Sequence, residues 1–173
     1  MKKFTILLLF LLIHSIVNAA NIKEIIIEGN KRVSKETILM FSDININENI
    51  DEKKINEILI NLYESNFFDN VNVDLKDSIL KIFVKELPII ESINFTGLKA
   101  NKHKEAVKKN LKLRSRSSYN KFLLFEDKKE ISKTLRELGY YFSNIDTFIE
   151  DLGDNKVNVN YKIDLGNKAK IKK

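Results

Sequence analysis

The stretch Ile-Lys-Glu-Ile-Ile-Ile-Glu-Gly-Asn at residues 22–30 returns as Ile-Glu-Ser-Ile-Asn-Phe-Thr-Gly-Leu at residues 90–98. A second pair follows in the same order, because Leu-Tyr-Glu-Ser-Asn-Phe-Phe at 62–68 corresponds to Leu-Arg-Glu-Leu-Gly-Tyr-Tyr at 135–141. Blocks that recur in order, about seventy residues apart, are typical of tandem copies of one small domain. The duplication therefore predicts a modular array and disfavours an enzyme with a single active site.

The first nineteen residues have the pattern of a secretory signal peptide. A basic start, residues 1–3, precedes the apolar run 4–13, and residues 17–19 offer a cleavage site between Ala19 and Ala20. The alternative is an uncleaved membrane anchor, which needs about 20 predominantly apolar residues. Polar residues interrupt this run at His14, Ser15 and Asn18. Both interpretations predict an exported protein.

The composition excludes several classes of function. The net charge is +6, and loss of residues 1–19 leaves 28 basic against 24 acidic residues, interspersed along the chain. Nucleic-acid binding normally needs a clustered basic face, so we expect no nucleic-acid partner. The chain has no cysteine, and each copy must be held by its own small hydrophobic core.

The first copy reads as strand, helix, helix, strand, strand. A β-branched strand ends at the turn Gly29-Asn30, Ser34 is the expected N-cap of a short helix, and Asp51 that of a longer one. The longer helix carries a continuous apolar stripe formed by Ile55, Ile58, Leu59, Leu62 and Tyr63. Alternating strands follow through residue 75 and over residues 80–85, and Pro88 marks the end of the copy.

The second copy repeats this order. We expect a strand at 90–96, helices at 102–113 and around the stripe of Ile131, Leu135 and Leu138, and paired strands at 142–149 and 157–163. A loop at 114–125 should place Phe122-Leu123-Leu124-Phe125 either as a plug on the domain's own core or as a binding patch. Residues 167–173 resemble the start of a third copy.

No catalytic, cofactor or metal site can be assigned. His14 lies in the predicted signal peptide, which leaves His103 alone on a lysine-rich helix. Without cysteine and with one histidine, a zinc site is disfavoured, and the five glycines form no phosphate-binding pattern. We therefore expect a protein that is not an enzyme and has no cofactor.

Four motifs resemble those of polypeptide-transport-associated (POTRA) repeats: Gly-Asn-Lys-Arg-Val-Ser at 29–34, the Leu-Tyr…Phe-Phe block at 62–68, Val-Lys-Glu-Leu-Pro at 84–88, and Gly139-Tyr140. Asn66 stands where the family usually has glycine, and Leu98 stands where it usually has asparagine. Both positions are turns or caps, so these departures affect local loop shape and leave the fold expectation intact.

The resemblance implies an α+β fold of tandem β-α-α-β-β domains, each with a three-stranded mixed sheet covered by two helices. The expected bounds are 1–19 for the signal peptide, 20–88 and 89–166 for two repeats, and 167–173 for the start of a third. The family further implies a location on the periplasmic face of a Gram-negative outer membrane, ahead of a membrane β-barrel. Unfolded outer-membrane proteins, accessory lipoproteins and a periplasmic chaperone are the implied partners.

The second strand of each repeat is the candidate binding element. The resemblance to this family implies that the strand forms a sheet edge, to which extended peptides add by main-chain hydrogen bonds. The residues concerned are Val71, Val73 and Leu75 in the first repeat and Phe142, Ile145 and Phe148 in the second. The alternative is that these strands are only sheet edges, shielded in the first repeat by Asp69, Asp74 and Lys76.

Two other roles stay open at this point. One is a barrel transporter of the translocation or two-partner secretion type, which carries similar repeats. The other is a cell-division scaffold with one repeat behind an uncleaved anchor.

The mature N-terminus separates the scaffold from the exported array. We expect mass spectrometry of the exported protein to find Ala20 as the first residue, because signal peptidase reads small residues at the preceding positions. An intact Met1 terminus would favour the anchored scaffold.

Overall fold

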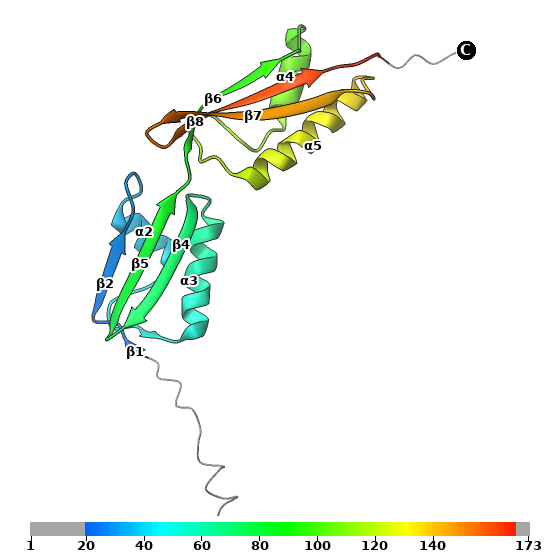
Figure 1. Cartoon of the computed structure of the whole chain (residues 1–173). Helices are drawn as coiled ribbons and strands as arrows, with labels where there is room; N and C mark the ends of the chain where they lie inside the picture. Colours follow the sequence, from blue (N-terminus) through cyan, green and yellow to red (C-terminus); the bar gives the residue numbers. More distant parts are fainter. Residues whose placement is uncertain (1–19, 169–173) are drawn as a thin grey trace, which may run out of the picture. The chain divides into compact units, whose positions relative to one another are not determined.

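The computed structural model describes residues 20–168, and the chain divides into two compact units with their main boundary between residues 85 and 86 (Figure 1). The predicted signal peptide up to Ala19 and residues 169–173 lie outside the described residues. The first unit contains β1 (Ala20–Asn21), β2 (Glu24–Glu28), α2 (Lys35–Ser42), β3 (Asn49–Ile50), α3 (Glu52–Glu64), β4 (Phe68–Lys76) and β5 (Ile79–Glu86). The second contains β6 (Ile89–Thr96), α4 (Asn101–Lys109), α5 (Lys121–Glu137), β7 (Asn144–Gly153) and β8 (Lys156–Asp164).

The helices of the first unit begin at the caps that the sequence predicts. The Ser34 hydroxyl accepts a hydrogen bond from the Thr37 amide at 3.2 Å, and the Asp51 carboxylate accepts one from the Lys54 amide at 2.8 Å. At the far end of α3, Asn66 adopts a left-handed φ of 59°. Asparagine tolerates this conformation better than most residues, which explains how it can replace the glycine usual at this position.

The sheets of the two units have the same strand order, in which the last strand of the unit lies in the middle. In the first, β5 lies between β2 and β4, with β2 parallel to it so that Ile25 pairs with Leu80 and Ile27 with Ile82. In the second, β8 lies between β6 and β7, parallel to the former and antiparallel to the latter. The second strand of each repeat is therefore an outer strand.

The two hairpins turn in the same way. Asp77 and Ser78 join β4 to β5, Asp154 and Asn155 join β7 to β8, and all four residues have positive φ. Two consecutive left-handed residues are typical of a type I′ turn, whose twist matches the twist of the flanking strands.

The α+β fold class expected from the sequence, with a three-stranded mixed sheet and two helices in each unit, is confirmed.

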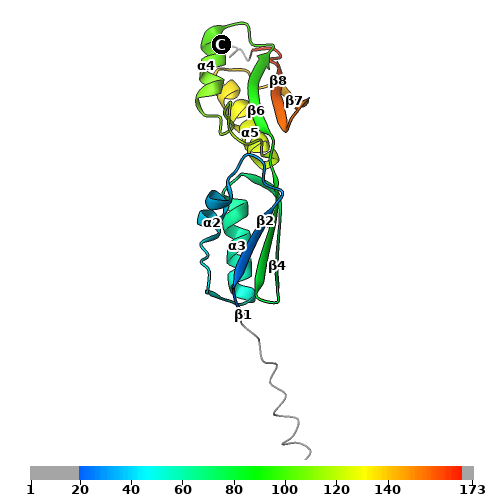
Figure 2. The same ribbon diagram turned by 90° about the vertical axis from the view of Figure 1, so that its left-hand side faces the viewer.

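Both helices of each unit cover one face of its sheet, and the hydrophobic core lies between them (Figures 1 and 2). In β5, Leu80, Ile82 and Val84 are fully buried while the residues between them are exposed. In β8, Val157, Val159, Tyr161 and Ile163 alternate in the same way. Because strand side chains alternate between the two faces, the residues between these buried ones lie on the face that carries no helix.

One carboxylate is buried in the second unit. Asp127 on α5 is fully buried and accepts hydrogen bonds from the amides of Lys112 at 2.6 Å and Leu113 at 3.0 Å, and from the Tyr161 hydroxyl at 3.3 Å. Burial, and then the negative charge of Asp127, raise the pKa of Tyr161 above its ordinary value, so this hydroxyl stays a donor. Asp127 thus links the segment between α4 and α5, through Lys112 and Leu113, to Tyr161 on the central strand β8.

Two expectations for the second unit are wrong. The predicted loop at 114–125 ends at Asn120, whose side chain accepts hydrogen bonds from the Phe122 and Leu123 amides and starts α5. Because the four-residue apolar run is helical, its side chains separate: Leu123 and Leu124 pack on the core, while Phe122 and Phe125 are exposed. The first helix is also shorter than expected and ends at Lys109.

Gly29 and Gly97 occupy equivalent places at the ends of β2 and β6. Their φ angles are +84° and +87°, and a Cβ added to either would overlap the carbonyl oxygen of Val84 or of Ile163, respectively. The first strand therefore leaves the sheet directly against the backbone of the central strand. Only glycine allows both this conformation and this approach.

We expect Gly29→Ala and Gly97→Ala each to lower the free energy of unfolding by about 3 kcal/mol, from the left-handed strain and the backbone overlap together. Gly153→Ala is the matched control, because Gly153 has a φ of +77° but nothing within 4 Å of an added Cβ. It should cost only about 1 kcal/mol. Urea unfolding followed by circular dichroism measures all three, and equal losses would contradict this explanation.

Candidate functional site: the outer strands and the groove beside α5

The residues predicted to bind peptides lie mostly on the outer strands. Val71, Val73 and Leu75 are all in β4, and Ile145 and Phe148 are in β7. Phe142 is a correction: it lies in the turn at residues 141–142, and β7 begins only at Asn144. The left-handed Gly139 that ends α5 is followed by a turn, so the chain reaches the sheet later than the sequence pattern indicates.

On β4 the predicted side chains face the helices. Val71 is buried, and Val73 and Leu75 are half-buried, so their side chains belong to the core. The Val71 amide donates a hydrogen bond of 3.1 Å to the hydroxyl of Tyr63 on α3. A donor at the start of this outer strand is therefore already used by the protein itself.

On β7 the two predicted residues point to opposite faces. Ile145 is buried toward α5, whereas Phe148 is 63% exposed on the face that carries no helix. Asn144, Asp146 and Glu150 share the face of Phe148 because strand side chains alternate. What β7 offers a peptide is its backbone edge, with a different set of side chains on each side.

The two long helices place different residues beside these strands. The buried residues Ile58 and Leu62 of α3 correspond to Ile131 and Leu135 of α5, since each pair lies four residues apart on the core stripe. The neighbouring positions then correspond as follows: Ile55 with Lys128, Leu59 with Ser132, and Tyr63 with Arg136. An apolar side stripe in the first repeat is thus a polar, cationic one in the second.

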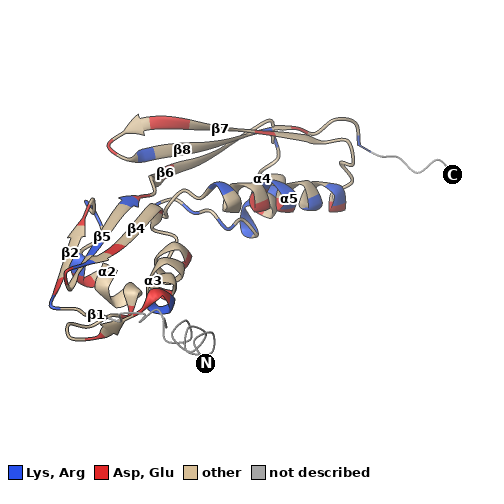
Figure 3. Cartoon of the chain, turned by 60° about the horizontal axis from the view of Figure 1, so that its bottom comes forward, with Lys and Arg blue, Asp and Glu red and all other residues tan. Residues whose placement is uncertain are grey.

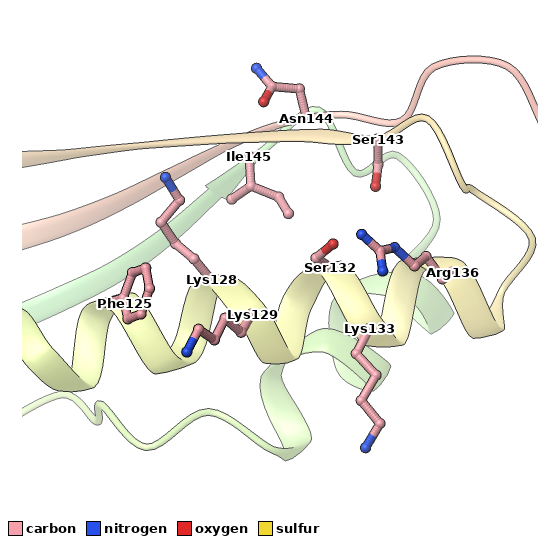
Figure 4. Close-up of a pocket in the computed structure, with 9 residues that line it drawn as sticks. All are labelled: Phe125, Lys128, Lys129, Ser132, Lys133, Arg136, Ser143, Asn144 and Ile145. Atoms are coloured by element: carbon pink, nitrogen blue, oxygen red, sulfur yellow. The ribbon is translucent and has the colours of Figure 1, made fainter.

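A groove of about 460 Å³ runs between α5 and the start of β7 (Figure 4). Lys128, Ser132 and Arg136 project from the helix toward the strand, as Figure 4 shows, and Ile145 forms part of the opposite wall. Its remaining lining residues are Phe125, Lys129, Lys133, Ser143 and Asn144. At one end of the groove, the Lys129 ammonium group packs on the face of the Phe125 ring, 4.3 Å from the ring centroid.

The helix-free face of the second sheet carries a polar ladder that sequence reasoning missed. The Ser92 hydroxyl donates to the side-chain oxygen of Asn158 at 2.6 Å, and the side-chain amide of Asn94 donates to the side-chain oxygen of Asn160 at 3.0 Å. The side-chain amide of Asn158 donates to the Glu150 carboxylate at 2.9 Å. The alternation of asparagine with valine in β8 was the available signal. These bonds connect the three strands on the face opposite the helices.

Residues 20–168 hold no cluster of three or more histidine, cysteine or acidic side chains placed to bind a metal ion. His103 packs edge-on against Tyr140, with ring centroids 5.4 Å apart. None of the helices in this part of the chain is both long and apolar enough to span a bilayer. The arrangement offers backbone edges and a charged groove.

Comparison with known proteins identifies similar repeats. The chain matches the model of the POTRA family, "surface antigen variable number repeat", over residues 20–87 and again over 88–166. It is 29% identical over 153 residues to the outer membrane protein assembly factor BamA of Neisseria meningitidis serogroup B, covering 87% of this chain and 19% of that protein. It is 26% identical over 145 residues to BamA of Neorickettsia risticii, covering 84% and 18%.

Solved structures share the fold. The N-terminal domain of Omp85 from Thermosynechococcus elongatus matches with a TM-score of 0.58 at 15% identity, over 83% of this chain and 63% of that one. The first two POTRA repeats of Omp85 from Anabaena match with a TM-score of 0.52 at 14% identity, over 83% and 95%. The chain spans about a fifth of the length of the curated relatives it matches.

The Tyr63 hydrogen bond can be tested by amide exchange. We expect Tyr63→Phe to speed hydrogen exchange of the Val71 amide about five-fold, the equivalent of one net hydrogen bond, while the core amides keep their rates. NMR exchange measures this residue by residue. Tyr141→Phe, which removes an exposed hydroxyl, is the control. An unchanged exchange rate of the Val71 amide would show that Tyr63 does not protect this amide.

Proposed function

The chain belongs to the POTRA family, and from this premise we propose that it is the periplasmic region of an outer-membrane β-barrel assembly protein. It binds unfolded barrel proteins and accessory subunits by adding their extended segments to the outer strands β4 and β7. The observation that carries this proposal is the strand order, which leaves the second strand of each repeat at the edge of its sheet.

Strand addition suits clients of varied sequence. Its affinity comes from main-chain hydrogen bonds, which every unfolded polypeptide can make, and side-chain pockets add selectivity. Outer strands that lie antiparallel to their neighbour present a row of alternating donors and acceptors. Such an edge can hold a barrel strand before that strand has found its final neighbours.

One edge alone binds weakly. About five main-chain hydrogen bonds contribute a net ~0.5–1.5 kcal/mol each. Ordering the peptide costs about 1–2 kcal/mol per residue. We therefore expect dissociation constants in the high micromolar range or weaker for a single repeat. Repeats in tandem hold one client more tightly because the second contact forms at a high effective concentration.

The rest of the proposed setting rests on the same family membership and, for the signal peptide, on the pattern of the first nineteen residues. Residues 1–19 are the signal peptide, 20–88 and 89–166 are the two repeats, and 167–173 begin a third. The protein lies on the periplasmic face of a Gram-negative outer membrane, anchored by a β-barrel beyond this chain. Accessory lipoproteins and a periplasmic chaperone share the repeats with the client.

Site-specific photo-cross-linking in cells tests this role. With a photo-reactive residue replacing Phe148 on β7 in the full-length protein, we expect covalent adducts with newly made outer-membrane barrel proteins. Lys108 on α4 is the control position, because it is exposed but lies on a helix away from the strand edge. Adducts at Lys108 equal to those at Phe148, or none with barrel proteins, would contradict client binding at β7.

A further inference from the structure

We propose that the β7 edge of the second repeat selects extended segments that carry acidic side chains on the side facing α5. This inference rests on the proposed strand addition and names the chemistry of the preferred client segment. It assigns the recognition to two cations, Lys128 and Arg136, that project from α5 toward β7 (Figure 4).

The two outer strands differ in how many of their backbone groups are free to pair. In the first repeat, the Tyr63 hydroxyl accepts the hydrogen bond of the Val71 amide, so the protein itself already uses one backbone donor of the outer strand β4. Arg136 stands at the position corresponding to Tyr63, and a guanidinium cannot accept a hydrogen bond from a strand amide. Arg136 therefore cannot occupy a β7 amide in the way that Tyr63 occupies that of Val71.

Among the residues that the structure describes, two cations of the groove have no acidic partner. Lys129 forms an ion pair with Glu126 at 3.1 Å, and Lys133 one with Glu130 at 3.9 Å. Within the part of the chain that the structure describes, neither Lys128 nor Arg136 forms an ion pair. Lys128 is moreover half-buried, which strengthens its attraction to an incoming carboxylate.

The spacing of these two cations matches the repeat of an extended strand. Lys128 and Arg136 lie eight residues apart on one helix, which is about 12 Å at 1.5 Å per residue. In an extended strand, residues i and i+4 point to the same side and lie about 13 Å apart. A segment with acidic residues at i and i+4 therefore matches both cations when it lies along β7, which runs beside α5 (Figure 4).

The opposite side of β7 reinforces the selection. Asp146 and Glu150 lie on the helix-free face of this strand, and Figure 3 shows acidic residues on β7 and basic residues along α5. An added strand that turned its acidic side chains to the helix-free face would meet like charges. The edge thus favours one orientation of an acidic segment as well as the segment itself.

A polypeptide fits this arrangement better than a flat anionic surface. The two cations line a groove of about 460 Å³ beside a strand edge, where a single extended chain makes backbone and ionic contacts together. On the same helix, Glu126 and Glu130 form ion pairs with Lys129 and Lys133, so these two lysines add little net positive charge for a flat anionic membrane. The occupant is therefore an acidic extended peptide.

Three eleven-residue peptides of alternating Val and Thr test the proposal, with Asp, Asn or Lys at positions 4 and 8. These positions are symmetric about the peptide centre, so parallel and antiparallel addition are probed equally. NMR titration of the chain from Ala20 to Lys173 gives both the affinity and the strand that responds. We expect the Asp peptide to bind about three- to ten-fold more tightly than the Asn peptide, the size expected of two exposed ion pairs.

Variants of α5 assign this preference to residues. Lys128→Gln with Arg136→Gln should abolish the difference between the Asp and Asn peptides. The matched control, Lys129→Gln with Lys133→Gln, removes the same charge from the same helix but from cations that already have partners. It should leave the preference intact. Lys128→Glu with Arg136→Glu should reverse the preference toward the Lys peptide.

Equal affinities for the Asp and Asn peptides, or an equal loss in the control variant, would overturn the selectivity. If the Asn peptide still shifts the β7 amides, strand addition survives that result. If no peptide shifts them, the proposed function fails together with the inference. Tighter binding to vesicles with 30% phosphatidylglycerol than to the Asp peptide, lost in the Lys128→Gln Arg136→Gln variant, would also overturn it in favour of a lipid surface.

Discussion

The parallel pairing of the first strand of each repeat with the third is the constraint on which the remaining structure depends. This pairing brings the end of β2 against the backbone at Val84 and the end of β6 against that at Ile163, so closely that only Gly29 and Gly97 fit. With the first strand on one side of the central strand and the hairpin on the other, the second strand becomes an outer strand. The edge that binds clients in our proposal is a consequence of this order.

The same framework supports two different edges because one helix position changes. The Tyr63 hydroxyl reaches the β4 backbone and accepts a hydrogen bond from the Val71 amide, which gives this donor a partner within the protein. Arg136 in the second repeat offers only donors and a positive charge. A duplication that preserves the core thus leaves the two copies free to diverge in the residues that flank the outer strand.

Much of the fold follows from local signals in the sequence. Ser34 and Asp51 cap their helices as expected, because an N-cap needs only a side-chain oxygen three residues before an amide. The turn residues and the alternation of β5 and β8 are equally local. The strand order, by contrast, rests on pairings between distant residues, and only the resemblance to a known family indicated it.

The failures of sequence reasoning have physical causes. The run Phe122 to Phe125 reads as a loop plug, but Asn120 caps a helix there and its turns send the two phenylalanines into solvent. Phe142 falls in a turn, which the strand pattern after Gly139 does not reveal. The groove beside α5 depends on which helix residues point toward β7, and that is set by tertiary packing.

The most direct test of the central claim is amide hydrogen exchange of both outer strands with and without a bound unfolded barrel protein. If a client strand adds to the edge, alternate amides of β7 must become protected, because only every second residue of a strand directs its N–H outward. We expect this alternating protection on β7 and a smaller effect on β4. Protection confined to helix amides, with both outer strands unchanged on client binding, would contradict the account.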